Sequence, residues 1–200
     1  EDGIRDLRMS RVGSEMCIRD RIMKGDIAEA KLFNPDFIIA NMHWGLEYER
    51  IPSREQRELA DWLLRQGVDL VIGSHPHVVQ PMELRRGKEG VTDRLVVYSL
   101  GNFISNMSRE HTDGGVMVKV VLGRKGLRRY IVSAQYSLIY SSRYKNEQGK
   151  EDIRVVPAAS WLGKNQNSSF SVDSALIKYV NNTRLFLKGN NKEVEEYIFE

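Results

Sequence analysis

Two short apolar segments with one amphipathic segment between them leave few folds open to this chain. Residues 36–43 (DFIIANMH) and 68–72 (VDLVI) have the length and the β-branched content of buried strands. Between them, Ser53 and Gln56 form a capping-box signature, apolar side chains follow at helical spacing, and a glycine then ends the pattern. This order of strand, helix and strand predicts a βαβ unit with its helix over about 54–66.

The second half of the chain has a different pattern, in which apolar strands are joined by glycine-containing turns. Residues 81–85 and 94–100 flank one turn, and residues 115–122 and 127–135 flank another. These are hairpin signals, so we expect antiparallel pairing and, overall, a mixed α/β (α+β) fold. Further elements are expected elsewhere: a helix over 22–33, a strand over 153–156, a loop over 163–169 (GKNQNSS) and a terminal helix over 172–187.

The first 21 residues, EDGIRDLRMSRVGSEMCIRDR, have no sustained helical or alternating pattern and predict no packed element. The piece GSEMCIRDR resembles a translated sequencing adapter, so we expect residues 1–21 to be non-native. We therefore divide the chain into this segment, a main domain over 22–160, and a C-terminal loop and helix over 161–200.

Composition excludes several classes of protein. The chain has 30 basic and 27 acidic residues with a net charge of +3, and this balanced mixture gives no reason to expect a nucleic-acid partner. No apolar stretch approaches the roughly 20 residues of a membrane helix. Cys17 is the single cysteine, so we expect neither an intrachain disulfide nor a cysteine-ligated zinc site.

Three of the four histidines lie where the two predicted strands end. His43 ends the first strand, and His75 and His77 come just after the second. Because parallel strands end at the same edge of a sheet, we expect these side chains to converge. In an extended His75-Pro76-His77 segment both imidazoles project to one side, and neutral imidazole is the commonest metal ligand. We favour a metal site, with ordinary loop histidines as the alternative.

Two further polar residues are candidates for chemistry. Glu47 lies four residues after His43, where its carboxylate could ligate a metal, orient an imidazole or relay a proton, or could be a solvated surface group. Asn102 lies in the segment 98–103, which ends another strand with a small residue, an amide and an aromatic. That segment fits a substrate-contact loop and fits structural punctuation equally well.

Aromatic residues accompany both candidates. Trp44, Tyr48 and Phe103 could form a ligand-binding surface, as a sugar- or peptide-binding module without a metal would require, whereas core packing explains them as readily. His111, between Glu110 and Asp113 in a polar loop, is expected to be exposed.

Three segments in order resemble the signatures of one bacterial family. They are His43-Trp-Gly-Leu-Glu47-Tyr48, Gly73-Ser-His75-Pro-His77-Val and Ser99-Leu-Gly-Asn102-Phe103. They look like the C-terminal motifs of capsule-synthesis proteins of the CapA type, and the resemblance covers roughly residues 22–156. That family is similar to calcineurin-like metallophosphatases, so the resemblance implies the C-terminal part of a sandwich with two sheets between helices around a two-metal centre.

The resemblance also implies roles for the residues that match. The cofactors would be two divalent metal ions in the full-length parent, with Mn, Fe and Zn equally acceptable. The implied site residues are the metal ligands His43, His75 and His77, the catalytic groups Glu47 and Asn102, and the substrate-binding aromatics Trp44, Tyr48 and Phe103.

By the same resemblance, the parent protein takes part in making capsule or poly-gamma-glutamate through a metal-dependent, phosphoesterase-like hydrolase site. The alternative is a non-catalytic envelope scaffold that assists a capsule polymerase. Either implies the capsule-synthesis machinery as partner and a membrane-anchored, extracytoplasmic location in the cell envelope.

One departure from the family pattern bears on metal binding. Family members carry Gly-Asp and Asn-His motifs upstream, and neither precedes His43 here. We therefore expect an incomplete site that binds metal poorly, because a dinuclear centre also needs carboxylate and amide ligands. We also expect an unpaired sheet edge, an uncovered apolar face and a tendency to aggregate.

Overall fold

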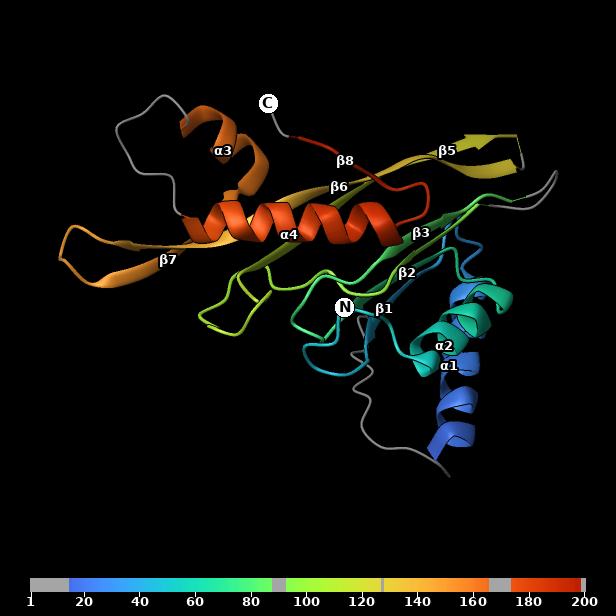
Figure 1. Ribbon diagram of the computed structural model, residues 1–200. Helices are drawn as coiled ribbons and strands as arrows, with labels where there is room; N and C mark the ends of the chain where they lie inside the picture. The colour runs from blue at the N-terminus through green and yellow to red at the C-terminus, as the bar shows by residue number, and fades with distance from the viewer. Residues whose placement is uncertain (1–14, 88–92, 127, 166–173, 199–200) are drawn as a thin grey trace.

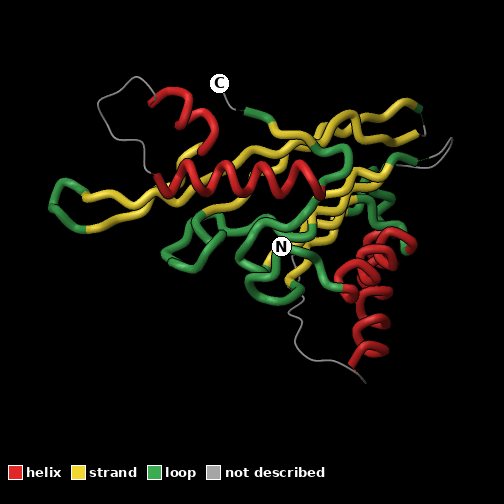
Figure 2. Tube along the Cα trace, viewed as in Figure 1, coloured by secondary structure: helices red, strands yellow, loops and turns green. Residues whose placement is uncertain are grey.

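The computed structural model describes residues 15–87, 93–126, 128–165 and 174–198. Within these residues the chain forms two β-sheets that share one apolar core (Figures 1 and 2). Helices α1 and α2 lie together beside the first sheet, and α3 and α4 lie beside the second (Figure 1). The mixed α/β class predicted from the sequence is confirmed.

The first sheet contains the predicted βαβ unit. Its strands, in spatial order, are β1 (Ile39–His43), β2 (Leu70–Ser74), β4 (Arg94–Val97) and β3 (Met82–Arg85). Strands β1, β2 and β4 run parallel, and β3 runs antiparallel to β4. The register places His43 directly opposite Ser74. The βαβ prediction is therefore confirmed, and the first two strands end side by side.

Two helices cover one face of this sheet. Helix α2 (Arg54–Arg65) begins with the predicted capping box, in which the Ser53 side chain accepts from the Gln56 amide and the Gln56 side chain accepts from the Ser53 amide. Helix α1 (Glu15–Leu32) contributes to the same apolar cluster. This cluster includes Met23, Ile27, Ala60, Leu63, Val71 and Tyr98.

The second sheet is built around one long strand. Its members are β5 (Gly114–Lys125), β6 (Arg128–Lys145), β7 (Glu151–Pro157) and β8 (Glu195–Glu196). Strand β6 pairs antiparallel with β5 and β7 along its length and parallel with β8. A register shift between Val121 and Leu122 interrupts the β5–β6 ladder.

The C-terminal helix packs into the core that the two sheets share. Helix α4 (Ser174–Asn190) supplies buried side chains to this core, and α3 (Ala158–Asn165) packs against β6, β7 and α4. The core includes Leu84 and Leu95 of the first sheet, Val116 and Leu138 of the second, and Leu176 and Leu187 of α4. Although we treated residues 161–200 as a separate segment, α4 and β8 are part of the same folded unit.

The structure departs from the predicted elements in several respects. Helix α1 begins at Glu15, so the prediction of no element in residues 1–21 is wrong for its last part, and residues 1–14 lie outside the described residues. The predicted hairpin of β3 and β4 forms, but β4 also pairs with the parallel strand β2. Helix α3 includes the start of the predicted loop 163–169, and the rest of that loop lies outside the described residues. Strand β8 was not predicted, because a strand of two residues has no sequence signal.

Strand β1 lies at the edge of the first sheet in the described part of the chain. Ile39 on this strand is 53% exposed, and Leu32 and Phe33 at the end of α1 are 84% and 81% exposed. An open edge with exposed apolar side chains nearby is the arrangement expected to favour aggregation. Among the described helices, none combines the length and the apolar character needed to cross a membrane.

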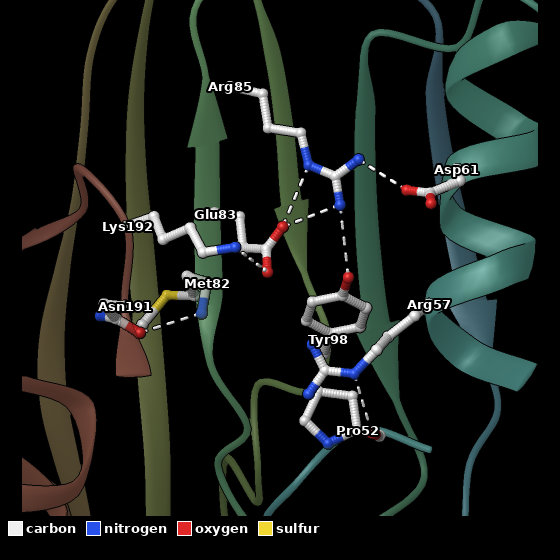
Figure 3. Close-up of polar contacts among 9 residues, drawn as sticks. All are labelled: Pro52, Arg57, Asp61, Met82, Glu83, Arg85, Tyr98, Asn191 and Lys192. Atoms are coloured by element: carbon white, nitrogen blue, oxygen red, sulfur yellow. Dashed lines mark hydrogen bonds and ion pairs between the residues drawn. The ribbon is translucent and has the colours of Figure 1, made fainter. Parts of the chain in front are cut away.

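A buried acid joins the first sheet to α2 and to the C-terminal segment (Figure 3). Glu83 is 5% exposed, accepts hydrogen bonds from Arg85 at 2.8 and 3.0 Å, and pairs with Lys192 at 3.2 Å. Arg85 also pairs with Asp61 of α2 at 2.6 Å and lies 3.4 Å from the Tyr98 hydroxyl. Burial alone opposes ionisation, but the bonds from Arg85 and Lys192 outweigh it and hold the pKa of Glu83 below its ordinary value. We call these five residues the Glu83 network.

Candidate functional site

The three predicted histidines come together where β1 and β2 end. The ring centroids of His43 and His75 are 4.5 Å apart, and those of His75 and His77 are 6.2 Å apart. The pairing of β1 with β2 sets this approach, because His43 is opposite Ser74 and His75 is the next residue. We call this group of His43, His75 and His77 the histidine edge.

The backbone of the histidine edge is strained. His75 has φ +103° and His77 has φ +60°, in a region that residues with a Cβ rarely adopt. The segment is therefore not extended as we predicted, and the rings approach one another through these backbone angles. Hydrogen bonds from Trp44 N to Ser74 O (3.1 Å) and from Tyr48 N to Pro76 O (2.8 Å) hold the segment against the β1 loop.

Trp44 lies in the core beneath the histidine edge, not on its surface. It is 2% exposed, and its indole Nε1 donates to the carbonyl of Tyr98 at 2.8 Å. Gly73 makes room for this contact, because a Cβ at that position would lie 2.0 Å from Tyr98 O and 2.4 Å from Trp44 Nε1. The assignment of Trp44 to substrate binding is therefore corrected: its ring and its N–H are both used in packing.

His77 is surrounded by polar and aromatic groups. Its Nδ1 lies 2.9 Å from Oδ1 of Asn102, and its ring is 6.1 Å from the Tyr48 ring at an interplanar angle of 27°. The guanidinium of Arg109 lies 4.0 Å from the Tyr48 ring centroid. Asn102, predicted as a catalytic group, thus touches a histidine of the site. Arg109 was not predicted, because nothing in the polar segment that carries it distinguishes one residue from the next.

Glu47 is exposed on the loop after β1, and Phe103 is 64% exposed on the loop after β4. Glu47 acts on the site electrostatically, since it is one of the charges that shift the titration of its neighbours. Phe103 and the adjacent Ile104, 57% exposed, offer apolar surface of the kind a substrate-binding residue would need. The structure leaves the predicted roles of Glu47 and Phe103 as predictions.

The surroundings of His75 favour its neutral imidazole. Burial lowers the pKa of His75, His43 and His77 lower it further, and Glu47 partly offsets them. Burial also raises the pKa of Tyr48, as does its neighbour Glu47, so its phenol stays protonated. A neutral imidazole has a lone pair, which is the form that binds a metal or accepts a proton.

The donor set fits part of a metal centre. Adjacent imidazoles with an acid nearby are suitable ligands for Mn, Fe or Zn. Within residues 15–87, 93–126, 128–165 and 174–198, however, no three His, Cys, Asp or Glu side chains converge closely enough to enclose an ion. The histidine edge would therefore supply imidazole ligands to a metal ion, and the described residues alone do not enclose one.

His111, expected to be exposed, is half-buried. Burial lowers its pKa, as does the nearby Arg50, and the acids Glu110 and Asp113 oppose this effect. It takes no part in the histidine contacts above, and so it provides a control of the same residue type.

The fold and the site together define a class of protein. It is a mixed α/β protein in which histidine side chains gather where parallel strands end. The chain belongs to the family of bacterial capsule synthesis proteins described as PGA_cap, whose model matches residues 2–107 and includes the whole histidine edge.

Two relatives were found among characterised proteins. The chain is 35% identical to the PGA biosynthesis protein CapA of Bacillus subtilis (strain 168) over 107 residues, which are 54% of this chain and 26% of that protein. It is also 35% identical to the capsule biosynthesis protein CapA of Bacillus anthracis over 98 residues, 49% of this chain and 22% of that protein. The chain thus spans about a quarter of the length of these relatives.

Proposed function

We propose that this protein acts in the biosynthesis of capsule or poly-gamma-glutamate, and that the histidine edge is part of a metal-dependent, phosphoesterase-like hydrolase centre. Membership of the PGA_cap family and the names of the two relatives support the first part. The second part is supported by the geometry of His43, His75 and His77.

One observation carries the hydrolase proposal. His43 and His75 lie with ring centroids 4.5 Å apart, while His75 and His77 both keep a backbone conformation that is costly for a residue with a side chain. Such strain costs on the order of 1–3 kcal/mol for each residue, and it persists mainly where function requires the side chain in place. A glycine would relieve the strain, so the presence of imidazoles there favours a chemical role.

In this proposal His43, His75 and His77 would hold a divalent metal ion, Mn, Fe or Zn. When bound, such an ion supplies Lewis acidity that activates water and stabilises negative charge on a phosphoryl or amide oxygen. Glu47 would move protons at its exposed carboxylate, and Tyr48 packs on His77 and limits its motion. Phe103 would contact the substrate from the opposite loop.

The 200-residue chain alone should bind divalent metal weakly. The reason is that imidazoles without bridging carboxylates do not enclose two ions. Isothermal titration with Mn²⁺ and Zn²⁺ measures this directly, and tight binding of two ions per chain would contradict the proposal of an incomplete ligand set.

The hydrolase proposal itself is tested on the chain expressed together with the coding sequence that flanks it in its genome. Bound metals are measured by mass spectrometry in the wild type, in a His75→Ala/His77→Ala double variant and in a His111→Ala control. About two ions per chain, lost in the double variant and kept in the control, are expected. Absence of metal from all three proteins would remove the hydrolase proposal and leave the envelope scaffold.

We further propose a location in the cell envelope and a partnership with the capsule-synthesis machinery. Both rest on family membership. Fractionation of cells that make the whole protein, followed by cross-linking, tests them. Recovery in the cytosolic fraction without any capsule enzyme would contradict both.

A further inference from the structure

Asn102 bridges two segments that are far apart in the sequence. On one side its Oδ1 lies 2.9 Å from Nδ1 of His77, and on the other its Nδ2 donates to the carbonyl oxygen of Thr112 at 3.0 Å. Its own backbone N–H donates to Gly114 O at 3.0 Å. Both the main chain and the side chain of Asn102 are therefore anchored.

The contact with Thr112 fixes which way the Asn102 amide faces. A carbonyl oxygen can only accept a hydrogen bond, so the NH₂ group of Asn102 must be the end that faces Thr112. The amide oxygen is then the end that faces His77. Because an amide oxygen carries no hydrogen, the hydrogen in the contact with His77 must lie on Nδ1 of the imidazole.

Thr112 is itself held firmly. It is fully buried, and both its backbone N–H and its hydroxyl donate to the carbonyl of Arg109, at 3.2 and 2.6 Å. The carbonyl that orients Asn102 is thus fixed by a local turn. Thr112 therefore orients the Asn102 amide, and the Asn102 amide in turn orients His77.

We propose that Asn102 is a positioning residue that keeps neutral His77 in its Nδ1–H tautomer, which leaves the lone pair on Nε2. Neutral imidazole free in water favours the opposite tautomer, with hydrogen on Nε2, so the protein must supply the preference. The use of that lone pair for a metal ion rests on the proposed function, whereas the tautomer itself rests only on the hydrogen bonds above.

The tautomer is measured by long-range ¹H–¹⁵N NMR on the metal-free 200-residue chain with ¹⁵N-labelled histidine, at an alkaline pH where imidazole rings are neutral. The signals of His77 are identified by their loss in His77→Ala. In the wild type, Nδ1 should resonate in the protonated range and Nε2 in the unprotonated range.

Three variants separate positioning from general damage to the fold. Asn102→Leu keeps the size of the side chain but removes the acceptor. The population of neutral His77 should therefore move from mainly the Nδ1–H tautomer to mainly the Nε2–H tautomer. Asn102→Asp restores an acceptor and should restore Nδ1–H. Met107→Leu, which alters a neighbour whose sulfur lies 3.6 Å from the Asn102 Nδ2, should leave the ratio unchanged.

A wild type with hydrogen mainly on Nε2 of His77 overturns the proposal without reference to any variant. So does an Asn102→Leu protein that keeps its other amide signals and the wild-type tautomer ratio. Because no metal is present, either result is independent of the metal content of the whole protein, and the positioning role can fail while the hydrolase proposal stands.

Discussion

The Glu83 network and the histidine edge both place polar side chains on the first sheet, but they differ in how those groups are matched. In the network, the carboxylates of Glu83 and Asp61 each face a cation at 3.2 Å or less. At the histidine edge, His43 and His75 face each other, and His43 disfavours a positive charge on His75.

The Glu83 network and the histidine edge also differ in backbone conformation. Glu83 and Arg85 lie in β3, Asp61 lies in α2, and Lys192 pairs with Glu83 at the edge of β3, whereas His75 and His77 have positive φ angles. Opposite charges that satisfy one another stabilise a fold locally. Like groups held together on a strained backbone reduce its stability, which is consistent with the proposal that the second cluster is retained for chemistry.

The largest expected effect comes from the packing beneath the histidine edge. In Gly73→Ala the new Cβ would lie 2.0 Å from the carbonyl oxygen of Tyr98, a backbone atom that cannot move aside. The free energy of unfolding should fall by about 3 kcal/mol or more. Urea denaturation followed by circular dichroism measures the loss.

Gly25→Ala is the matched control for this substitution. A Cβ at Gly25, inside helix α1, would meet nothing within 4 Å, so the same change should raise stability by about 0.5–1 kcal/mol. Equal unfolding midpoints for Gly73→Ala and the wild type would show that Trp44 does not need the space at Gly73.

Removal of a matched charge should cost less than this but still be substantial. Glu83→Gln keeps the shape of a buried side chain while it weakens the bonds from Arg85 and Lys192, for an expected loss of about 2 kcal/mol. Thermal unfolding at neutral pH measures it. A loss below the experimental error would indicate that the network contributes no net stability.

The same variant should change the dependence of stability on pH. The pKa of Glu83 is lower in the folded state than its ordinary value of 4.5, so its contribution is complete above 4.5 and is lost as the pH falls through the folded-state value. Stability should therefore fall more steeply with acid in the wild type than in Glu83→Gln. The exposed acid Glu29, replaced by Gln, should leave the wild-type profile unchanged.

A change at the histidine edge should act in the opposite direction. His75→Gly removes the side chain from a residue with φ +103°. Relief of the backbone strain should outweigh the entropy cost of glycine, so the free energy of unfolding should rise by about 0.5–1 kcal/mol. His75→Ala keeps a Cβ at the same angle and should bring no gain. If both variants are less stable than the wild type to the same extent, His75 is a structural residue.

The smallest effect is expected at an exposed ion pair. Arg54 and Glu58 on α2 are 2.7 Å apart, but their side chains are 85% and 61% exposed. Arg54→Ala should therefore change stability less than any of the substitutions above. A larger loss in a urea titration would mean that proximity alone, without burial, is enough for a matched pair to stabilise this fold.

The sequence predicted the local parts of this molecule well. The capping box at Ser53 and the βαβ unit were predicted because hydrogen-bonding side chains and apolar periodicity act over a few residues. Convergence of His43, His75 and His77 followed from the rule that parallel strands end at one edge.

The features that were missed depend on distant partners. Nothing in the sequence around Trp44 shows that Tyr98 accepts its indole N–H across 54 residues, so the ring was assigned to a surface. The extension of β6 to Lys145 and the two residues of β8 are likewise fixed by strands elsewhere in the chain. The backbone angles at His75 and His77 were missed because they reflect tertiary contacts with the β1 loop, not local preference.

Closure of β3 by the C-terminal segment affects the order in which the chain can assemble during translation. Lys192 exchanges backbone hydrogen bonds with Met82 and Leu84, and the Asn191 side chain accepts from the Met82 amide across 109 residues. All strands of the first sheet leave the ribosome long before those partners are made. The histidine edge can thus form early, while the outer side of β3 stays open to wrong partners until Asn191 and Lys192 have been made.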